Sequence, residues 1–166
     1  LLMGVVMMVA GFGFKITSVP FQMWAPDVYE GSPTPVTAFL SVASKAAGFA
    51  VILRVFYVAF PLDELSIEWS AVFAGLAAVT MTLGNLVAIS QTNIKRMLAY
   101  STIAHAGYLM VGVAAVAARA SGAEASLGPA GVLYYLGGYA TMNLAAFAAL
   151  IAISNRIDSD KIADFA

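Results

Sequence analysis

The chain has 166 residues, of which 61% are hydrophobic and 10% are charged, with a formal net charge of -1. A soluble domain has about a quarter charged residues and about half apolar ones, so this composition excludes an ordinary soluble fold. The balanced charge excludes a nucleic-acid-binding face, and the lack of cysteine excludes disulfides and thiolate metal sites. We therefore expect an all-α membrane protein, a polytopic bundle of transmembrane helices.

Five apolar segments follow one another along the chain, and we expect them to form a single transmembrane fragment over residues 1–166. Four of them have about 20 residues, enough to cross about 30 Å of hydrocarbon at about 1.5 Å per residue. The first is long enough only if it continues into the polar stretch that follows it. Both ends of the sequence look cut, which indicates an internal fragment of a longer membrane protein. The expected spans are 1–30, 36–60, 70–89, 97–118 and 132–153.

The stretch FKITSVPFQMWAPDVYEGSPTP interrupts the first apolar segment. Pro20 lacks a backbone N–H and its ring clashes with the preceding turn, so it should break the helix near this point. Residues 21–29 would then form a second half-helix that returns to the membrane surface, giving a discontinuous helix of the kind found in transporters. Thr34 followed by Pro35 is typical of an N-cap and a first helical residue, and predicts where the next span begins.

Loop charges predict an orientation. The loop 61–68 carries acidic residues and no basic one, whereas the other loops carry most of the lysine and arginine. The positive-inside rule places those basic loops in the cytoplasm, with Arg119 as one exception. Aromatic residues near the span ends, Trp24, Tyr29 and Trp69, are expected to be interface anchors. The basic residues assigned to the cytoplasmic side are Lys95, Arg96, Arg156 and Lys161.

Lys45 is the clearest candidate functional residue. It lies nine residues after Val36, which is about 13.5 Å along a helix and close to the bilayer centre. A lysine there costs roughly 2.5–3.5 kcal/mol on insertion scales, so it needs a partner or a role. Thr37 and Ser41 precede it at helical spacing and predict a polar stripe leading to the amine. The alternative is a structural ion pair inside the bundle.

Lys15 and His105 are expected at a similar depth. A break at Pro20 leaves open carbonyls and room for water beside Lys15, although a lysine can also simply complement the C-terminal helix dipole. His105 lies about 12 Å into its span, with Ser101 and Tyr108 on the same face, and packing alone is an equal reading. Burial favours the neutral form of a lysine, so three titratable groups at one depth predict a row that passes protons through intervening waters.

Two further polar residues, Asn143 and Thr141, lie near the centre of the fifth span. They are expected to order channel water, or else to form hydrogen bonds between helices. The sequence shows no constellation typical of a metal site, a catalytic triad or a nucleotide fingerprint. Proton translocation is therefore the chemistry that these residue types support.

Two long motifs, VPFQMWAPDVYEGSPTPVTAFLSVASKAAGF and LGNLVAISQTNIKRMLAYSTIAHAGYLMVG, resemble a known family. They are similar to the antiporter-like membrane subunits of proton-pumping NADH:quinone oxidoreductase (respiratory complex I), and most similar to its subunit N branch. The resemblance covers nearly the whole chain. It implies that Pro20 lies in the family's discontinuous helix, that Lys15 and Lys45 match its two channel lysines, and that His105 matches a histidine of its relay.

The resemblance also carries expectations about partners. The family pattern has histidine where this chain has Gln22, which cannot titrate. A glutamate and a lysine of the family's relay are expected in the parts of the protein before and after this sequence. The chain itself is expected to bind no cofactor, and quinone, NADH, FMN and iron–sulfur clusters are expected in other subunits. Its partners would be other membrane subunits, lipid, protons and channel water, in a bacterial inner membrane.

The function predicted from the sequence is thus that of a membrane subunit of NADH:quinone oxidoreductase with a proton half-channel and a mid-membrane Lys/His relay. No redox site is expected in this part of the chain. Two other hypotheses remain open. One is a cation/proton antiporter subunit of the Mrp type, and the other is an assembly subunit whose buried lysines only form ion pairs.

Overall fold

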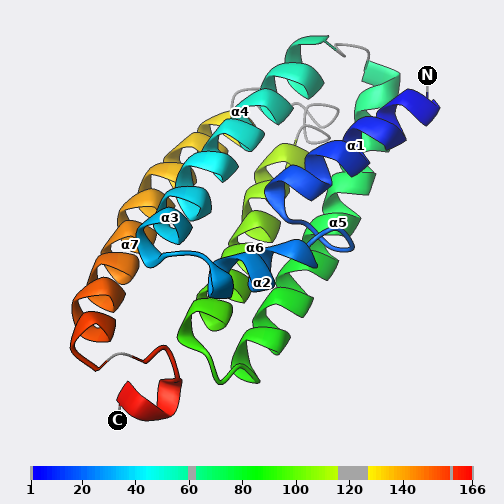
Figure 1. Cartoon of the computed structure of the whole chain (residues 1–166). Coiled ribbons are helices and arrows are strands. Elements are labelled where there is room, and N and C mark those ends of the chain that lie inside the picture. The colour runs from blue at the N-terminus through cyan, green and yellow to red at the C-terminus, as the bar shows by residue number, and fades with distance from the viewer. Residues whose placement is uncertain (1, 60–62, 116–126, 158, 166) are drawn as a thin grey trace.

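A computed structural model describes residues 2–59, 63–115, 127–157 and 159–165. Helices account for nearly all of these residues, and within them the extended structure is limited to an isolated antiparallel bridge between Asn93 and Lys161. Long helices lie side by side, and the N-terminus and the C-terminal turn lie at opposite ends (Figure 1). Among the described residues, the helices long and apolar enough to cross a membrane are Thr34–Tyr57, Trp69–Ile89, Ile94–Ala114 and Leu127–Ile157. The expected all-α membrane bundle is confirmed.

The first helix, α1 (Leu2–Ile16), ends four residues before Pro20. Thr17 has a positive φ of 63°, the peptide bond between Val19 and Pro20 is cis, and the short helix α2 (Trp24–Gly31) follows. The backbone between α1 and α2 is partly satisfied from another helix, because the N–H of Val19 donates to Thr80 Oγ1 at 3.1 Å. Two separate helices thus occupy the region expected to hold one broken span.

The second long helix is built from several pieces. It consists of α3 (Thr34–Phe39), the π-helical turn η1 (Leu40–Ser44), α4 (Lys45–Arg54) and a second π-helical turn, η2 (Val55–Ala59). π-Helical turns are rare and are frequent at functional sites. The first of them lies directly before Lys45.

The remaining helices form an antiparallel pair and one long partner. Helix α5 (Asp63–Ile89) packs along α6 (Ile94–Ala114), and α7 (Leu127–Ile157) packs on α3 and α6. Gly84 and Gly107 permit the close approach of α5 and α6. A Cβ on Gly84 would lie 2.7 Å from the Ala104 nitrogen, and one on Gly107 would lie 2.8 Å from the Met81 nitrogen. Small residues at such contacts are typical of helices that pack in lipid.

Several expected boundaries differ from the structure. Helix α5 begins at Asp63, so the stretch 63–68, predicted as loop, is helical. Lys95 and Arg96 lie in the first turn of α6, and α7 extends beyond 132–153 at both ends. An apolar run marks only the part of a helix inside hydrocarbon, and these helices continue past it. Thr34 is the first residue of α3 and Pro33 holds the cap position, which shifts the predicted cap by one residue. Arg119 lies outside the described residues.

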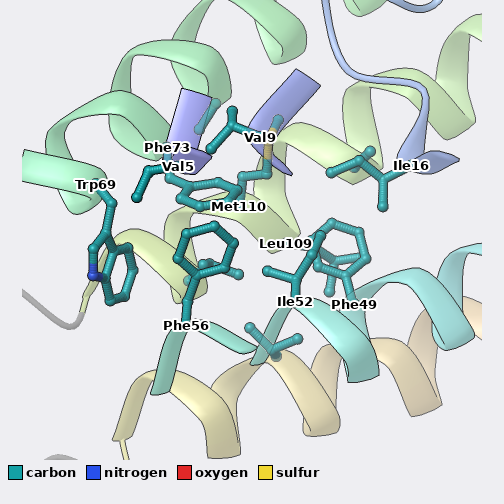
Figure 2. Packing of buried hydrophobic residues seen from close by; sticks show 14 residues of the cluster. Val5, Val9, Ile16, Phe49, Ile52, Phe56, Trp69, Phe73, Leu109 and Met110 are labelled. Carbon is teal, nitrogen blue, oxygen red and sulfur yellow. The ribbon is translucent and has the colours of Figure 1, made fainter. Parts of the chain in front are cut away.

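Buried apolar side chains form two clusters. The larger one, here called the aromatic core, contains Phe49, Phe56, Trp69 and Phe73 together with aliphatic residues of α1 and α6 (Figure 2). The smaller one, here called the apolar layer, joins α2, α6 and α7. Its buried members are Ala25, Tyr29, Ala99, Phe147 and Leu150.

Two predicted interface anchors are instead part of these clusters. Trp69 is 2% exposed and Tyr29 is 1% exposed, so neither side chain reaches a membrane surface within the described part of the chain. Trp69 packs between Phe56 and Phe73, with ring centroids 5.2 Å and 6.1 Å away. The prediction was wrong because aromatic residues near span ends also fill the gaps between helices. Trp24 is partly buried, and its indole donates to the Phe14 carbonyl at 3.1 Å.

Candidate functional site: a buried lysine among three helices

Lys45 lies at the meeting point of α4, α6 and α7. Its side chain is 1% exposed and its amine donates a hydrogen bond to the backbone carbonyl of Thr102 on α6. Thr37 and Ser41, the predicted stripe on the same helix, are both fully buried. Among the described residues, no carboxylate forms an ion pair with Lys45. The amine is therefore held by neutral oxygen, an arrangement that suits a lysine able to lose its proton.

A hydrogen-bonded group lies on the α7 side of Lys45. Asn143 Nδ2 donates to Ser41 Oγ at 2.9 Å and to the Tyr139 hydroxyl at 3.0 Å. The Tyr139 hydroxyl in turn donates to the Ser41 carbonyl at 3.0 Å, within the π-helical turn before the lysine. We call Ser41, Lys45, Thr102, Tyr139 and Asn143 the polar centre.

His105 extends this group along the membrane plane. Its ring lies 5.2 Å from the ring of Tyr139, and its Nδ1 is 2.6 Å from the hydroxyl of Tyr135. Tyr108 packs edge-on against the same imidazole at 5.6 Å and its hydroxyl accepts from Asn85. The structure thus connects His105 to the neighbourhood of Lys45 through tyrosines, which the sequence did not single out. Tyr139 precedes Asn143 by one helical turn, and that spacing was the available signal.

Lys15 is not part of the polar centre. The residue is exposed in the described structure, although its stem passes close to α4. A Cβ on Gly48 would lie 2.8 Å from Ile16 Cγ2 and 3.7 Å from Lys15 Cγ, which places the end of α1 one helical turn beyond Lys45. Helix rise gives the depth of Lys15, but the direction of its side chain depends on how α1 is rotated.

Two other predicted residues have no contact with the polar centre. Thr141 is exposed and its hydroxyl donates to the Gly137 carbonyl of its own helix at 3.1 Å. It is two residues from Asn143 and therefore points to another side of α7. Ser101 is half-buried on α6, beside the fully buried Thr102, whose carbonyl accepts from Lys45.

The region around Gln22 contains a small cavity of about 90 Å³, lined partly by Gln22, Gly84 and Tyr100. The buried Gln22 Oε1 and the nearby Ser18 Oγ have no hydrogen-bond partner among the described residues. Buried acceptors of this kind are usually satisfied by water. The position where histidine was expected therefore lies beside a polar space rather than in a tight apolar contact.

The end of the bundle that contains the basic residues is tied together by polar contacts. Asn93 Oδ1 caps α6 by accepting from the N–H groups of Lys95 and Arg96 at 2.9 and 3.2 Å. Arg96 pairs with Asp27 at 2.6 Å and with Glu30 at 2.8 Å, both on α2. These contacts fix the short helix α2 against the start of α6.

An open pocket of about 240 Å³ lies at this same end. Within it, Lys95 Nζ pairs with Asp160 Oδ2 at 2.8 Å. We call it the mouth pocket, and its lining residues are Thr34, Lys95, Ser154, Asn155, Ser159 and Asp160.

These features define an integral membrane helix bundle with a buried, unpaired lysine and a polar pocket at one end. The whole chain, residues 1–166, matches the model of the family described as NADH:quinone oxidoreductase/Mrp antiporter, TM. The chain belongs to this family.

Individual relatives agree with this assignment. The chain is 54% identical to NADH-quinone oxidoreductase subunit N of Heliobacterium modesticaldum over 166 residues, which are 100% of this chain and 33% of the relative. It thus spans about a third of the length of that relative. The predicted resemblance to the subunit N branch is confirmed.

Solved structures support the same fold. Respiratory complex I from Thermus thermophilus contains a chain that is 38% identical, with a TM-score of 0.68 over 95% of this chain and 31% of that one. The archaeal membrane-bound sulfane sulfur reductase matches with a TM-score of 0.84 and 23% identity, over 98% of this chain and 31% of that one. At that identity, the second likeness concerns the fold alone.

Proposed function

We propose that this chain is the central part of a membrane subunit of NADH:quinone oxidoreductase and that Lys45 carries protons through it. The observation that supports this most strongly is a lysine that is 1% exposed on a membrane-spanning helix and bonded to a backbone carbonyl. A permanently charged amine in this position is costly, and intramembrane lysines are usually functional. The amine exchanges one proton at a time with water that enters the polar centre.

The same proposal includes a lateral relay. From Lys45 the proton passes towards His105 through water and the hydroxyls of Tyr139 and Tyr135, which lie against the imidazole. Lys15 feeds the relay from the α1 side, across the close contact at Gly48. The relay partners outside this sequence would be an acid before it and a lysine after it.

Helices α1 and α2 would be the two halves of one discontinuous span. The non-helical residues between them contain three fully or nearly fully buried side chains, Thr17, Ser18 and Val19. Irregular backbone at membrane depth is tolerated where it is buried in protein or lines a polar space. The cavity beside Gln22 provides such a space.

The mouth pocket would face the cytoplasm of a bacterial cell, because basic residues gather at this end of the bundle. The redox chemistry would take place in other subunits, which would hold the NADH, FMN, iron–sulfur and quinone sites. Other membrane subunits of the complex, lipid and channel water would be the direct neighbours of this chain.

The test is Lys45→Ala in the full-length subunit within the assembled complex. We expect quinone-linked NADH oxidation in sealed vesicles to generate a much smaller pH gradient per NADH oxidised. Arg54→Ala is the matched control, because Arg54 is an exposed cation on the same helix and its loss should leave the gradient intact. Full pumping by an assembled Lys45→Ala complex would refute the proposal.

The two other hypotheses give different results. A cation/proton antiporter would form a pH gradient in vesicles when driven by sodium, without quinone chemistry. An assembly subunit would lose complex formation when Lys15 and Lys45 are both neutralised, while each complex that still assembles would pump normally.

A further inference from the structure

Three helices show the same sequence of layers between the mouth pocket and Lys45. On α7, Ser154 lines the pocket, Phe147 and Leu150 are buried in the apolar layer, and Asn143 belongs to the polar centre. The spacing of these four residues puts them on one face of the helix. Asn143 and Ser154 are about 16.5 Å apart along the helix, so the polar regions are separated by about two turns of apolar surface.

Helix α6 repeats this order. Lys95 lines the pocket, Ala99 is fully buried in the apolar layer, and Thr102 accepts the hydrogen bond from Lys45. The second long helix repeats it again, with Thr34 in the pocket, Ala38 packed against the apolar layer, and Ser41 in the polar centre. Three independent helices thus place their apolar residues at one level.

We propose that the apolar layer is a gate on the path by which protons reach Lys45 from the mouth pocket, and that Phe147 is its main barrier. This inference rests on the proposed function. Phe147 is 0% exposed and is the largest side chain that α7 contributes to the layer. Hydrophobic constrictions of this kind exclude water when closed and conduct when they become wet. The alanines that α3 and α6 contribute leave little bulk opposite it.

Thr37 gives water a polar contact as it crosses the layer. Its hydroxyl is fully buried at this level and bonds to the carbonyls of Tyr29 and Pro33 at 3.3 Å. When a file of water fills the layer, a hydronium ion in the mouth pocket gives one proton to that file. The neutral amine of Lys45 takes one proton from its other end, which leaves an ammonium group and water.

The chain contains no cysteine, so single cysteines can report where water reaches. We would introduce Ser154→Cys in the mouth pocket and, separately, Ser41→Cys in the polar centre of the full-length subunit in the intact complex. The probe is a small cationic methanethiosulfonate, which reacts with hydrated, ionised thiols. Its attachment is read from the mass of this subunit.

We expect Ser154→Cys to be modified quickly and Ser41→Cys to be protected. Adding Phe147→Ala to Ser41→Cys should raise its rate of modification by about tenfold or more, because the barrier is then short enough to stay wet. The matched control is Phe73→Ala, which removes the same side chain from the aromatic core and should leave the rate unchanged. Leu150→Ala is the second gate variant if the Phe147→Ala complex does not assemble.

The inference is overturned if Ser41→Cys reacts as fast as Ser154→Cys, or if the gate variants raise its rate no more than Phe73→Ala does. Because labelling depends on water and not on pumping, it is independent of the test of Lys45. A protected polar centre together with full pumping by Lys45→Ala would refute the proposed function and leave the barrier in place.

Discussion

The polar centre lies between two apolar clusters that differ in kind. On one side, the aromatic core stacks Phe56 against Phe12, Trp69 and Phe73, with ring centroids between 5.1 and 6.2 Å apart. On the other side, the apolar layer consists largely of alanines, with a few larger side chains such as Phe147. The first cluster is thick and draws on α1, α4, α5, α6 and α7, whereas the second is one to two helical turns thick.

This difference indicates the direction of access to Lys45. Interlocked aromatic rings resist the entry of water, because filling the space requires several large side chains to move together. The apolar layer has polar groups immediately on both sides, namely the mouth pocket and the Ser41–Asn143 pair. The aromatic core is therefore expected to act as a seal and the apolar layer as the passage.

The largest effect on stability is expected in the aromatic core. Phe56→Ala should cost about 3–5 kcal/mol, because it leaves a cavity among rings that cannot close over it. Leu150→Ala in the apolar layer should cost about 2–3 kcal/mol, since small neighbours can close part of the space. The measurement is the thermal unfolding midpoint of the purified full-length subunit. Equal shifts for the two variants would remove the distinction between seal and passage.

A smaller effect is expected at the surface end of the passage. Arg96→Ala removes the contacts to Asp27 and Glu30, whose side chains are 73% and 42% exposed. Because exposed ion pairs contribute about 0–1 kcal/mol, the unfolding midpoint should fall slightly and the difference should shrink at high salt. A salt-independent loss as large as that of Phe56→Ala would show that α2 is held in another way than described here.

The sequence predicted the polar stripe of Thr37, Ser41 and Lys45 because helical spacing puts these residues on one face. Their burial was predictable for the same reason, since a polar residue deep in an apolar span faces the bundle interior. Asn143 was predictable only as a depth. Its partners, Ser41 and Tyr139, follow from how α7 packs on the π-helical turn, and no local pattern encodes that packing.

The rotation of each helix about its axis was the part that the sequence could not predict. Depth follows from the rise per residue, so Lys15, Lys45 and Thr141 all had plausible depths. Whether a side chain points to a neighbouring helix depends on packing between segments far apart in the chain. That is why Lys45 is buried while Lys15 and Thr141 are exposed, and why Trp69 lies in the core.

The most direct test of the account restores the amine at position 45 by chemistry. Lys45→Cys in the full-length subunit should abolish most of the pH gradient formed per NADH oxidised in sealed vesicles. Bromoethylamine then converts the thiol into a thioether bearing an amine, with loss of bromide, at nearly the length of lysine. The account predicts that pumping returns when the reagent is added during turnover at the membrane face of the mouth pocket. Unchanged pumping by Lys45→Cys, or no recovery after complete modification confirmed by mass, would contradict it.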